Sequence, residues 1–384
     1  MSVAVVHDHL VQRGGAERLL PAILGAFPGA PLHTSLYDPA TTHDAFRAID
    51  VTTRPIDRVA FLRRHHRAVA PLLAPTFSRL RLDADLVFCS SAGWSHATVA
   101  TEGAKLVYFH APARWLYAEE AFLGAAGPFV RLAAAATRRP LLRWDQRAAT
   151  TIDGFIANST ETARRLREAY HVDAEVVPPP VVLDPSGAQT PVPGIEPDYA
   201  LVVSRLIGYK HVDAVVEAFS LRPDDRLVVV GDGPEAARIR ADLPANVTLL
   251  GLVDEPQLRW LYANARLLVS AAHEDFGMTP PEAGAFGLPV AVLRHGGHLD
   301  TVLEGETGAF FDQLDPVEIS DAIDQVDAWH WDTATIRSHA ASFDALGFAD
   351  RLRAIATRHV GAGALGPTPL RPPAERPTRA PTID

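Results

Sequence analysis

The chain has 384 residues, which is too long for one compact core and fits two domains of ordinary size. Hydrophobic residues make up 47% of the sequence and charged residues 21%, a composition typical of a folded globular protein. The formal net charge of −10 argues against a general nucleic-acid binder, because such proteins present a basic surface to the phosphate backbone.

The first half of the sequence alternates between predicted strands and predicted helices. Residues 3–6 are apolar, as expected of a buried parallel strand, and a Gly14-Gly15 loop and a helix at residues 17–27 follow. Further strands, each followed by a helix-like stretch, are predicted at residues 86–89, 106–109 and 154–157. This alternation predicts a parallel, doubly wound α/β sheet, and we assign residues 1–178 to a first Rossmann-like domain.

A Pro- and Gly-rich stretch interrupts this pattern, and we interpret residues 179–197 as an interdomain linker. The alternation then restarts and predicts a second Rossmann-like domain at residues 198–336. Its strands are predicted at residues 201–203, 227–230, 247–250, 266–270 and 290–292, and its helices at residues 211–219, 235–241, 255–264 and 281–286. Two such domains leave a cleft between the carboxyl ends of their strands, where ligands bind in open α/β sheets.

The remaining features concern the end of the chain and its location. Residues 332–358 look helical, whereas residues 361–384 contain six prolines and no apolar period, which predicts a disordered tail. No run of about 18 apolar residues predicts a membrane span, and the single cysteine, Cys89, favours a reducing cytoplasm. The basic, apolar residues 59–82 are either a solvated helix pair or a peripheral contact with the inner face of the membrane.

The strongest motif is the sequence H-E-D-F-G-M-T-P-P-E at residues 273–282. It follows a predicted strand and leads through a glycine loop into a helix, whose free N–H groups and dipole favour an anion. Glu274 and Glu282 bracket this pocket. The alternative is that Glu282 only complements the helix dipole and that Glu274 only caps a loop.

A second motif, S-R-L-I-G-Y-K at residues 204–210, also follows a strand directly. Arg205 and Lys210 should therefore stand at the same sheet edge as Glu274. Two cations beside a helix start suit a diphosphate leaving group and could neutralise its developing charge without a metal. The alternative is a solvated loop with two ordinary surface cations.

Two features of the first domain point to the same cleft. His110 ends a predicted strand, where it could hydrogen-bond a sugar hydroxyl or take part in proton transfer, although a lone histidine is more often structural. Gly14 and Gly15 let the backbone approach a ligand, but the G-x-G-x-x-G spacing of a dinucleotide site is missing. Asp83 and Asp85 match a metal-binding D-x-D pattern, but they precede a strand instead of following one, so we interpret them as part of an ordinary loop. We expect neither a metal nor a cofactor.

Together these motifs resemble retaining glycosyltransferase family 4, which has the GT-B fold. Glu274 and Glu282 resemble its E-x7-E motif, Arg205 and Lys210 its donor-phosphate pair, and residues 14–17 its N-terminal glycine loop. Residues 294–302 resemble its GG-x-x-E-x-V loop, with Asp300 in place of the usual Glu. The resemblance covers residues 2–350.

Within this family, residues 110–115 and 204–213 resemble the WbaZ-like mannosyltransferase branch, although Ala111 and His211 replace a common Thr and a common Arg or Lys. The resemblance implies GDP-mannose as the donor, a substrate and not a cofactor. It also implies an acceptor-binding first domain and a final helix, at about residues 337–358, that crosses back onto that domain.

The resemblance further implies a role for each site residue. Arg205 and Lys210 hold the donor diphosphate, and Glu282 binds the ribose. The resemblance also implies that Glu274 and the backbone of Gly277, Met278 and Thr279 contact the sugar hydroxyls. His110 is implied to contact the sugar from the opposite domain, and Gly14 and Gly15 to contact the donor. The acceptor hydroxyl attacks on the leaving-group face with retention, and a donor phosphate oxygen takes its proton.

Two other functions remain open at this point. A nucleotide-sugar epimerase shares the two-domain fold but needs acid and base groups around the sugar C2, and we cannot place them in the sequence. A non-catalytic nucleotide-sugar-binding subunit is the other alternative. The acceptor of a transferase could be a glycan, a lipid-linked saccharide or glycolipid, or a small metabolite with a hydroxyl group.

Overall fold

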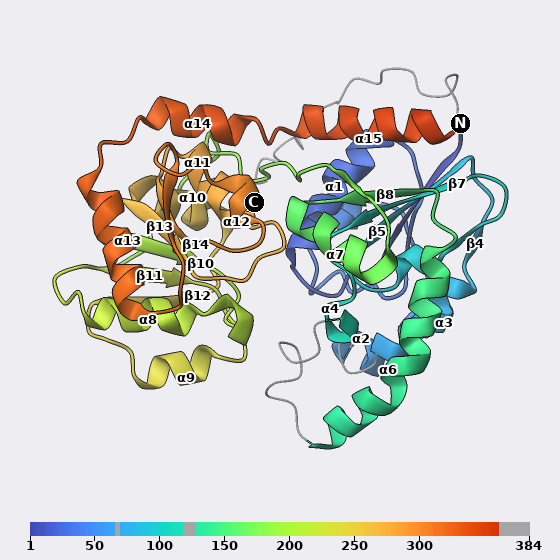
Figure 1. Cartoon of the computed structure of the whole chain (residues 1–384), viewed down its shortest axis with the longest axis horizontal. Coiled ribbons are helices and arrows are strands. Elements are labelled where there is room, and N and C mark those ends of the chain that lie inside the picture. The colour runs from blue at the N-terminus through green and yellow to red at the C-terminus, as the bar shows by residue number, and fades with distance from the viewer. Residues whose placement is uncertain (66–69, 118–127, 361–384) are drawn as a thin grey trace, which may run out of the picture.

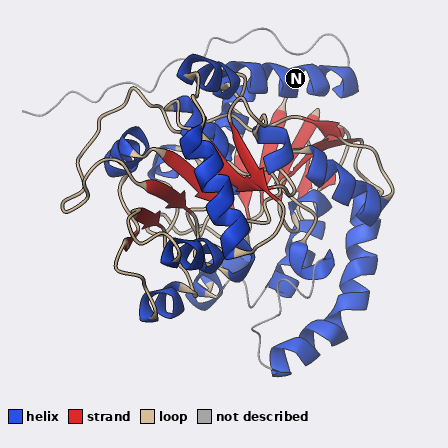
Figure 2. Ribbon diagram, turned by 60° about the vertical axis from the view of Figure 1, so that its left-hand side comes forward, coloured by secondary structure: helices blue, strands red, loops and turns tan. Residues whose placement is uncertain are grey.

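The computed structural model describes residues 1–65, 70–117 and 128–360. Two parallel sheets lie side by side, and helices pack against the faces of each (Figures 1 and 2). This arrangement confirms the predicted α/β class with two Rossmann-like domains. The tail at residues 361–384, which the sequence predicts to be disordered, lies outside the described residues.

The first sheet has seven strands in the order β3-β2-β1-β5-β7-β8-β9, and every pairing in it is parallel. Its strands are β1 (Val3–His7), β2 (Leu32–Thr34), β3 (Val51–Thr53), β5 (Leu86–Ser91), β7 (Ala104–Phe109), β8 (Gly154–Ala157) and β9 (Glu175–Val176). The helices of this half are α1 (Gly15–Ala26), α2 (Ala60–Arg64), α3 (Ala70–Ser78), α4 (Arg114–Tyr117), α6 (Pro128–Ala149) and α7 (Thr160–Tyr170). A separate small sheet pairs β4 (Arg81–Leu82) with β6 (Val99–Ala100).

The second sheet has six parallel strands in the order β12-β11-β10-β13-β14-β15. Its strands are β10 (Ala200–Val203), β11 (Leu227–Val230), β12 (Val247–Gly251), β13 (Leu267–Ser270), β14 (Val290–Leu293) and β15 (Gly308–Phe311). The helices around it are α8 (Val212–Ser220), α9 (Ala236–Ala241), α10 (Glu255–Asn264), α11 (Thr279–Ala285), α12 (His298–Thr301), α13 (Pro316–Ala328) and α14 (Thr333–Ala341).

The strands expected from the sequence are present, because the buried central strands are continuous apolar runs that leave a clear signal. The missed strands are short or begin with a residue that favours other structures. Thus β3 is the three-residue edge strand V-T-T, and β15 begins at Gly308. The periodic signal of a strand needs four or more residues to be visible.

The chain crosses back to the first domain between two helices instead of within one. The single helix expected at about residues 337–358 is divided into α14, which ends at Ala341, and α15 (Ala345–Val360). In Figure 1, α14 lies over the second domain and α15 over the first. Phe348, Leu352 and Ile355 of α15 are buried in the core that α1 and the first sheet form.

Part of the expected linker packs on the second domain. Leu183 and Val192 are buried in the core that contains Tyr199 and the α10 helix. The Arg259 Nε donates a hydrogen bond of 2.8 Å to the Asp184 carbonyl. The segment between β9 and β10 is therefore held against the second domain.

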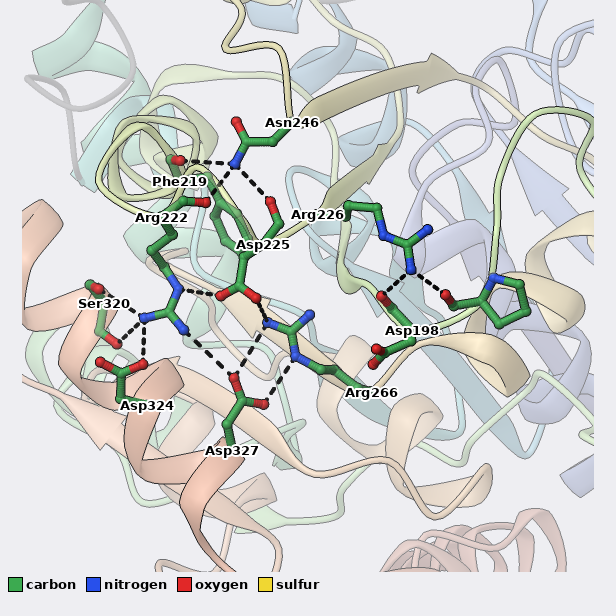
Figure 3. Close-up of polar contacts among 11 residues, drawn as sticks. Asp198, Phe219, Arg222, Asp225, Arg226, Asn246, Arg266, Ser320, Asp324 and Asp327 are labelled. Carbon is green, nitrogen blue, oxygen red and sulfur yellow. Dashed lines mark hydrogen bonds and ion pairs between the residues drawn. The ribbon is translucent and has the colours of Figure 1, made fainter.

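A polar network ties together the amino ends of the second-sheet strands, at the edge away from the predicted cleft (Figure 3). The Arg222 guanidinium lies 2.6 Å from carboxylate oxygens of both Asp225 and Asp324. The Asn246 Nδ2 contacts the carbonyl oxygens of Phe219, Arg222 and Asp225 at 3.0, 2.8 and 2.7 Å. This network fixes the turn between α8 and β11 and serves stability.

We predict that Asn246→Ala lowers the free energy of unfolding of the second domain by about 1–3 kcal/mol, because half-buried carbonyls lose their donor. Urea denaturation measures the change. Asp242→Ala, at an exposed position in the same connection, is the matched control and should change stability by less than about 0.5 kcal/mol. Equal effects of the two substitutions would show that the network contributes nothing specific.

Candidate functional site

Parallel strands bring the second-domain residues of the predicted site together. β10 and β13 are neighbours in the sheet, so the loops after them meet at one edge. Lys210, in the short 3₁₀-helix Gly208–Lys210, makes an ion pair with Glu274 through Nζ and Oε1. The side chains of these two residues are 12% and 19% exposed, so both are partly open to solvent.

Arg205 lies in the same loop as Lys210, as the sequence predicts. It is exposed, and its Nη2 lies 3.1 Å from the Tyr209 hydroxyl. Lys210 is thus held by a carboxylate at the cleft, whereas the Arg205 guanidinium extends toward solvent beside it.

Two glycine-containing segments of the second domain, residues 273–282 and 294–302, pack against each other. Gly277 has φ +81°, a left-handed conformation that favours glycine, in the turn leading into α11. The Gly297 N–H donates to the Glu274 carbonyl at 3.0 Å. A Cβ on Gly297 would lie 2.2 Å from the Phe276 Cα, so residues 294–302 pack directly on the backbone of the E-x7-E segment. This packing fixes the backbone of Gly277, Met278 and Thr279, which the sequence predicts to face the donor.

Glu282 contacts both domains. Its carboxylate is buried and lies 2.7 Å from the Nη1 of Arg18 on α1 and 3.2 Å from the Tyr262 hydroxyl. Burial raises the pKa of Glu282, although Arg18 and Tyr262 oppose this shift. Because the carboxylate has these two specific partners, its role extends beyond complementing the α11 dipole. Sequence reasoning missed Arg18 and Tyr262.

His110 ends β7 at the facing edge of the first sheet. Its Nε2 lies 2.8 Å from the Ser90 Oγ, and the same hydroxyl lies 3.0 Å from the Nδ1 of His7. Burial and the neighbouring His7 lower the pKa of His110 to about 4. His110 is therefore neutral near pH 7. Ser90 was not predicted as a site residue, although its position directly after the apolar residues 86–89 indicates the carboxyl end of a strand.

Asp8 organises the loop beside His110. Its carboxylate accepts hydrogen bonds from the backbone N–H groups of Ala92, Trp94 and Ser95 at 2.6, 2.8 and 2.7 Å. Burial opposes ionisation of Asp8, but His7 and these N–H groups lower its pKa. Asp8 therefore supports this loop, whereas the neighbouring His7 contacts Ser90 and His9 contacts Glu17. Among the described residues, no group of three or more His, Cys, Asp or Glu side chains is arranged to hold a metal ion.

The Gly14-Gly15 loop accommodates a buried carboxylate. A Cβ on Gly14 would lie 2.3 Å from the Glu17 Oε2, so a side chain at this position would displace the carboxylate. The Gln12 Nε2 donates to the Glu17 Oε1 at 2.9 Å, and the His9 Nδ1 lies 3.5 Å from Oε1 as well. Burial opposes ionisation, but His9 and Gln12 lower the pKa of Glu17 to about 2. Glu17 is therefore a permanent negative charge at the start of α1.

Three polar contacts join the two domains around this site. In addition to Arg18 and Glu282, the Arg165 Nη1 lies 2.7 Å from the Asp275 carboxylate. The Asp300 carboxylate accepts hydrogen bonds of 2.6 Å from both the backbone N–H and the hydroxyl of Thr160, at the start of α7. The aspartate that replaces a longer glutamate therefore reaches the opposite domain. These contacts bring the first-domain and second-domain residues of the site face to face.

The basic segment near residue 60 lies in the first domain and carries exposed apolar side chains. Val59 is 49% and Phe61 62% exposed, while the Arg63 guanidinium lies 3.6 Å from the Asp57 carboxylate. Residues 66–69 of the segment lie outside the described residues. In the part of the chain that the structure describes, none of the helices is both long and apolar enough to cross a bilayer.

Residues 190–327 match the family described as Glycosyl transferases group 1. The chain is 29% identical to the D-inositol 3-phosphate glycosyltransferase of Thermobispora bispora over 263 residues, 59% of this chain and 61% of that protein. It is 35% identical to the GDP-mannose-dependent alpha-mannosyltransferase of Corynebacterium glutamicum over 133 residues, 34% of this chain and 30% of that protein. The chain spans about half the length of the curated relatives it matches.

Solved structures share the fold across both domains. The sucrose-phosphate synthase of Thermosynechococcus elongatus superimposes with a TM-score of 0.67 and 19% identity, covering 93% of this chain and 99% of that one. Anabaena HepE in complex with UDP-glucose gives a TM-score of 0.65 and 18% identity, covering 93% of this chain and all of that one. Residues 190–327 thus match a group 1 glycosyl transferase domain, and the chain as a whole shares the two-domain GT-B fold of these structures.

Proposed function

We propose that this protein transfers a sugar from a nucleotide-sugar donor to an acceptor hydroxyl with retention at the anomeric carbon, and that GDP-mannose is the favoured donor. The observation that carries the proposal is the Lys210–Glu274 pair at the carboxyl edge of the second sheet, beside Arg205. The name of the Corynebacterium glutamicum relative supports GDP-mannose. The resemblance of residues 110–115 and 204–213 to a mannosyltransferase branch supports the same donor.

The charges of the site suit a diphosphate that leaves without a metal. Glu274 neutralises the charge of Lys210, and Arg205 lies in the same loop as Lys210. A donor diphosphate would replace the Glu274 carboxylate as the partner of Lys210, because it carries more charge and more acceptor oxygens. Glu274 is then released to accept hydrogen bonds from sugar hydroxyls, while both cations stabilise the leaving group.

Glu282 would bind the ribose while it remains paired with Arg18. A carboxylate has about four lone-pair sites, so it can accept from Arg18, from Tyr262 and from a ribose hydroxyl together. This extends the role that the family resemblance implies for Glu282, because the first domain also takes part in organising the nucleotide site.

The pairing of both glutamates also bears on the reaction. A carboxylate that is already engaged is a poorer nucleophile than a free one. Glu282 is bound to Arg18, and in the donor complex Glu274 would accept hydrogen bonds from sugar hydroxyls. We therefore expect the acceptor hydroxyl to attack on the leaving-group face, with a donor phosphate oxygen accepting its proton. A covalent sugar adduct on Glu274, trapped and located by mass spectrometry, would contradict this mechanism.

The acceptor belongs to the first domain in this proposal. A hydroxyl of a glycan, of a glycolipid or of a small metabolite would enter beside His110 and the Asp8-supported loop. The exposed Val59 and Phe61, in a basic segment, would suit a cytoplasmic enzyme that touches the inner face of the membrane.

A thermal-shift panel of GDP, UDP and ADP sugars tests the donor. At about 100 times its dissociation constant, the correct donor should stabilise the fold by about 2.7 kcal/mol. We expect GDP-mannose to give the largest shift. Preference for a UDP sugar would contradict the mannose assignment, and a lack of response to every nucleotide sugar would contradict the proposed function.

Lys210→Ala should reduce kcat with any accepted donor by about 100-fold or more, since it removes one stabilising donor from the leaving group. Sugar transfer over an acceptor panel provides the measurement. Arg167→Ala, which removes an exposed charge at the far end of α7, is the matched control. Near-normal turnover of the Lys210 variant would remove this lysine from the site. Epimerised donor formed without acceptor would instead indicate an epimerase.

His110 should make folding stability depend on pH. Its folded pKa, about 4, lies below the value of about 6.5 for an unfolded histidine, so the folded state binds fewer protons. The stability that comes from the neutral form of His110 is fully present above pH 6.5 and is lost as the pH falls from 6.5 toward 4. By pH 5 the loss is about 2 kcal/mol.

His110→Gln should therefore lose less stability than the parent protein between pH 7 and pH 5, as measured by urea denaturation at both pH values. The exposed His330→Gln is the matched control and should behave like the parent protein. If His110→Gln loses as much stability as the parent, His110 is not held neutral by its environment.

A further inference from the structure

Three adjacent strands of the first sheet place two histidines on either side of one serine. His7 ends β1, Ser90 lies opposite it on β5, and His110 follows β7. The Ser90 Oγ is 3.0 Å from the Nδ1 of His7 and 2.8 Å from the Nε2 of His110. Ser90 is 0% and His7 1% exposed, so solvent does not reach the hydroxyl and cannot replace either contact.

The hydrogen-bonding capacity of these groups couples the two rings. A hydroxyl has one proton, so Ser90 can donate to only one of the two ring nitrogens and must accept from the other. If His7 donates from Nδ1, Ser90 donates to the Nε2 of His110, and the His110 proton must be on Nδ1. If His110 donates from Nε2, Ser90 donates to the Nδ1 of His7, and the His7 proton must be on Nε2.

We propose that Ser90 is a positioning residue that couples the tautomers of His7 and His110 and thereby sets which nitrogen of His110 carries its proton. In either arrangement both rings carry the proton on the same kind of nitrogen, Nδ1 in one case and Nε2 in the other. The Nδ1 of His110 is a donor in the first arrangement and an acceptor in the second.

This inference rests on the proposed function for its consequence, because His110 is proposed to hydrogen-bond the transferred sugar. A sugar hydroxyl can donate or accept, but its geometry in the site differs between the two cases. A single fixed tautomer holds the donor in one orientation, and a mixture would lower the fraction of productive complexes.

Other polar groups lie next to the hydrogen-bonded series His7–Ser90–His110. Ser91, the next residue on β5, is also buried, but its Oγ contacts the His96 Nδ1 at 3.3 Å and not His110. The Asp8 and Glu17 carboxylates and the His9 ring act electrostatically on His7. Ser90 and Ser91 are therefore a matched pair of buried serines, one inside the hydrogen-bonded series and one outside it.

Nitrogen-15 NMR of the ligand-free full chain, labelled at its 16 histidines, reads the tautomers directly. The signals of His7 and His110 are assigned with His7→Gln and His110→Gln. We expect matching tautomers in the parent protein, and a changed tautomer ratio for at least one ring in Ser90→Ala. Ser91→Ala should leave both rings unchanged. One ring protonated at Nδ1 and the other at Nε2 in the parent protein would overturn the proposal.

Kinetics provide the second readout. Ser90→Ala should lower kcat about tenfold with little change in the KM for the donor, and Ser90→Thr, which keeps the hydroxyl, should recover part of the loss. Ser91→Ala should transfer sugar at the parent rate. Equal kinetics of Ser90→Ala and Ser91→Ala would contradict the proposal. Because NMR needs no substrate, failure of transfer with every donor would refute the proposed function and leave the coupling standing.

Discussion

Parallel strand pairing brings the chemical groups at each sheet edge of the site together. All strands of a parallel sheet end at the same edge, so residues that follow neighbouring strands meet there whatever their separation in sequence. β10 and β13 are neighbours, and Lys210 therefore meets Glu274. β1, β5 and β7 are neighbours, and His7, Ser90 and His110 therefore form one chain of hydrogen bonds. The two edges then face each other through polar contacts of α1 and α7 with Glu282 on α11, Asp275 in the loop before it and Asp300 on α12.

Opposite charges are paired at this site. Glu282 is buried against Arg18, and Glu274 is paired with Lys210. Removing one member of a buried pair leaves the other without compensation, at a cost of about 3–5 kcal/mol. A ligand of this site must therefore satisfy the same partners. The proposed nucleotide-sugar donor would do so, because its phosphates would match the cations and its hydroxyls the carboxylates.

The sequence was sufficient to predict the α/β fold, its central strands and the position of Lys210 and Glu274 at one sheet edge. These predictions rest on apolar runs and on the rule that parallel strands end together, both of which are local or topological. The partner of Glu282 could not be predicted, because Arg18 lies 264 residues away and the orientation of two domains leaves no periodic signal. Ser90 was missed because its role depends on the register of three strands. The break between α14 and α15 was missed because Phe343, which continues the apolar pattern, is buried there.

The lysine content of the chain allows a direct measurement at the donor site. Lys105 and Lys210 are its two lysines, and Lys105 is 2% exposed, with its Nζ bonded to the carbonyls of His96 and Thr98. Reductive methylation with carbon-13 formaldehyde should therefore label Lys210 and the N-terminus and keep their charge. On titration with GDP-mannose, the methyl signal of Lys210 should move as the diphosphate displaces Glu274, while the N-terminal signal stays fixed. Saturable binding of the nucleotide sugar with no change in the Lys210 signal would contradict the assignment of this edge as the donor site.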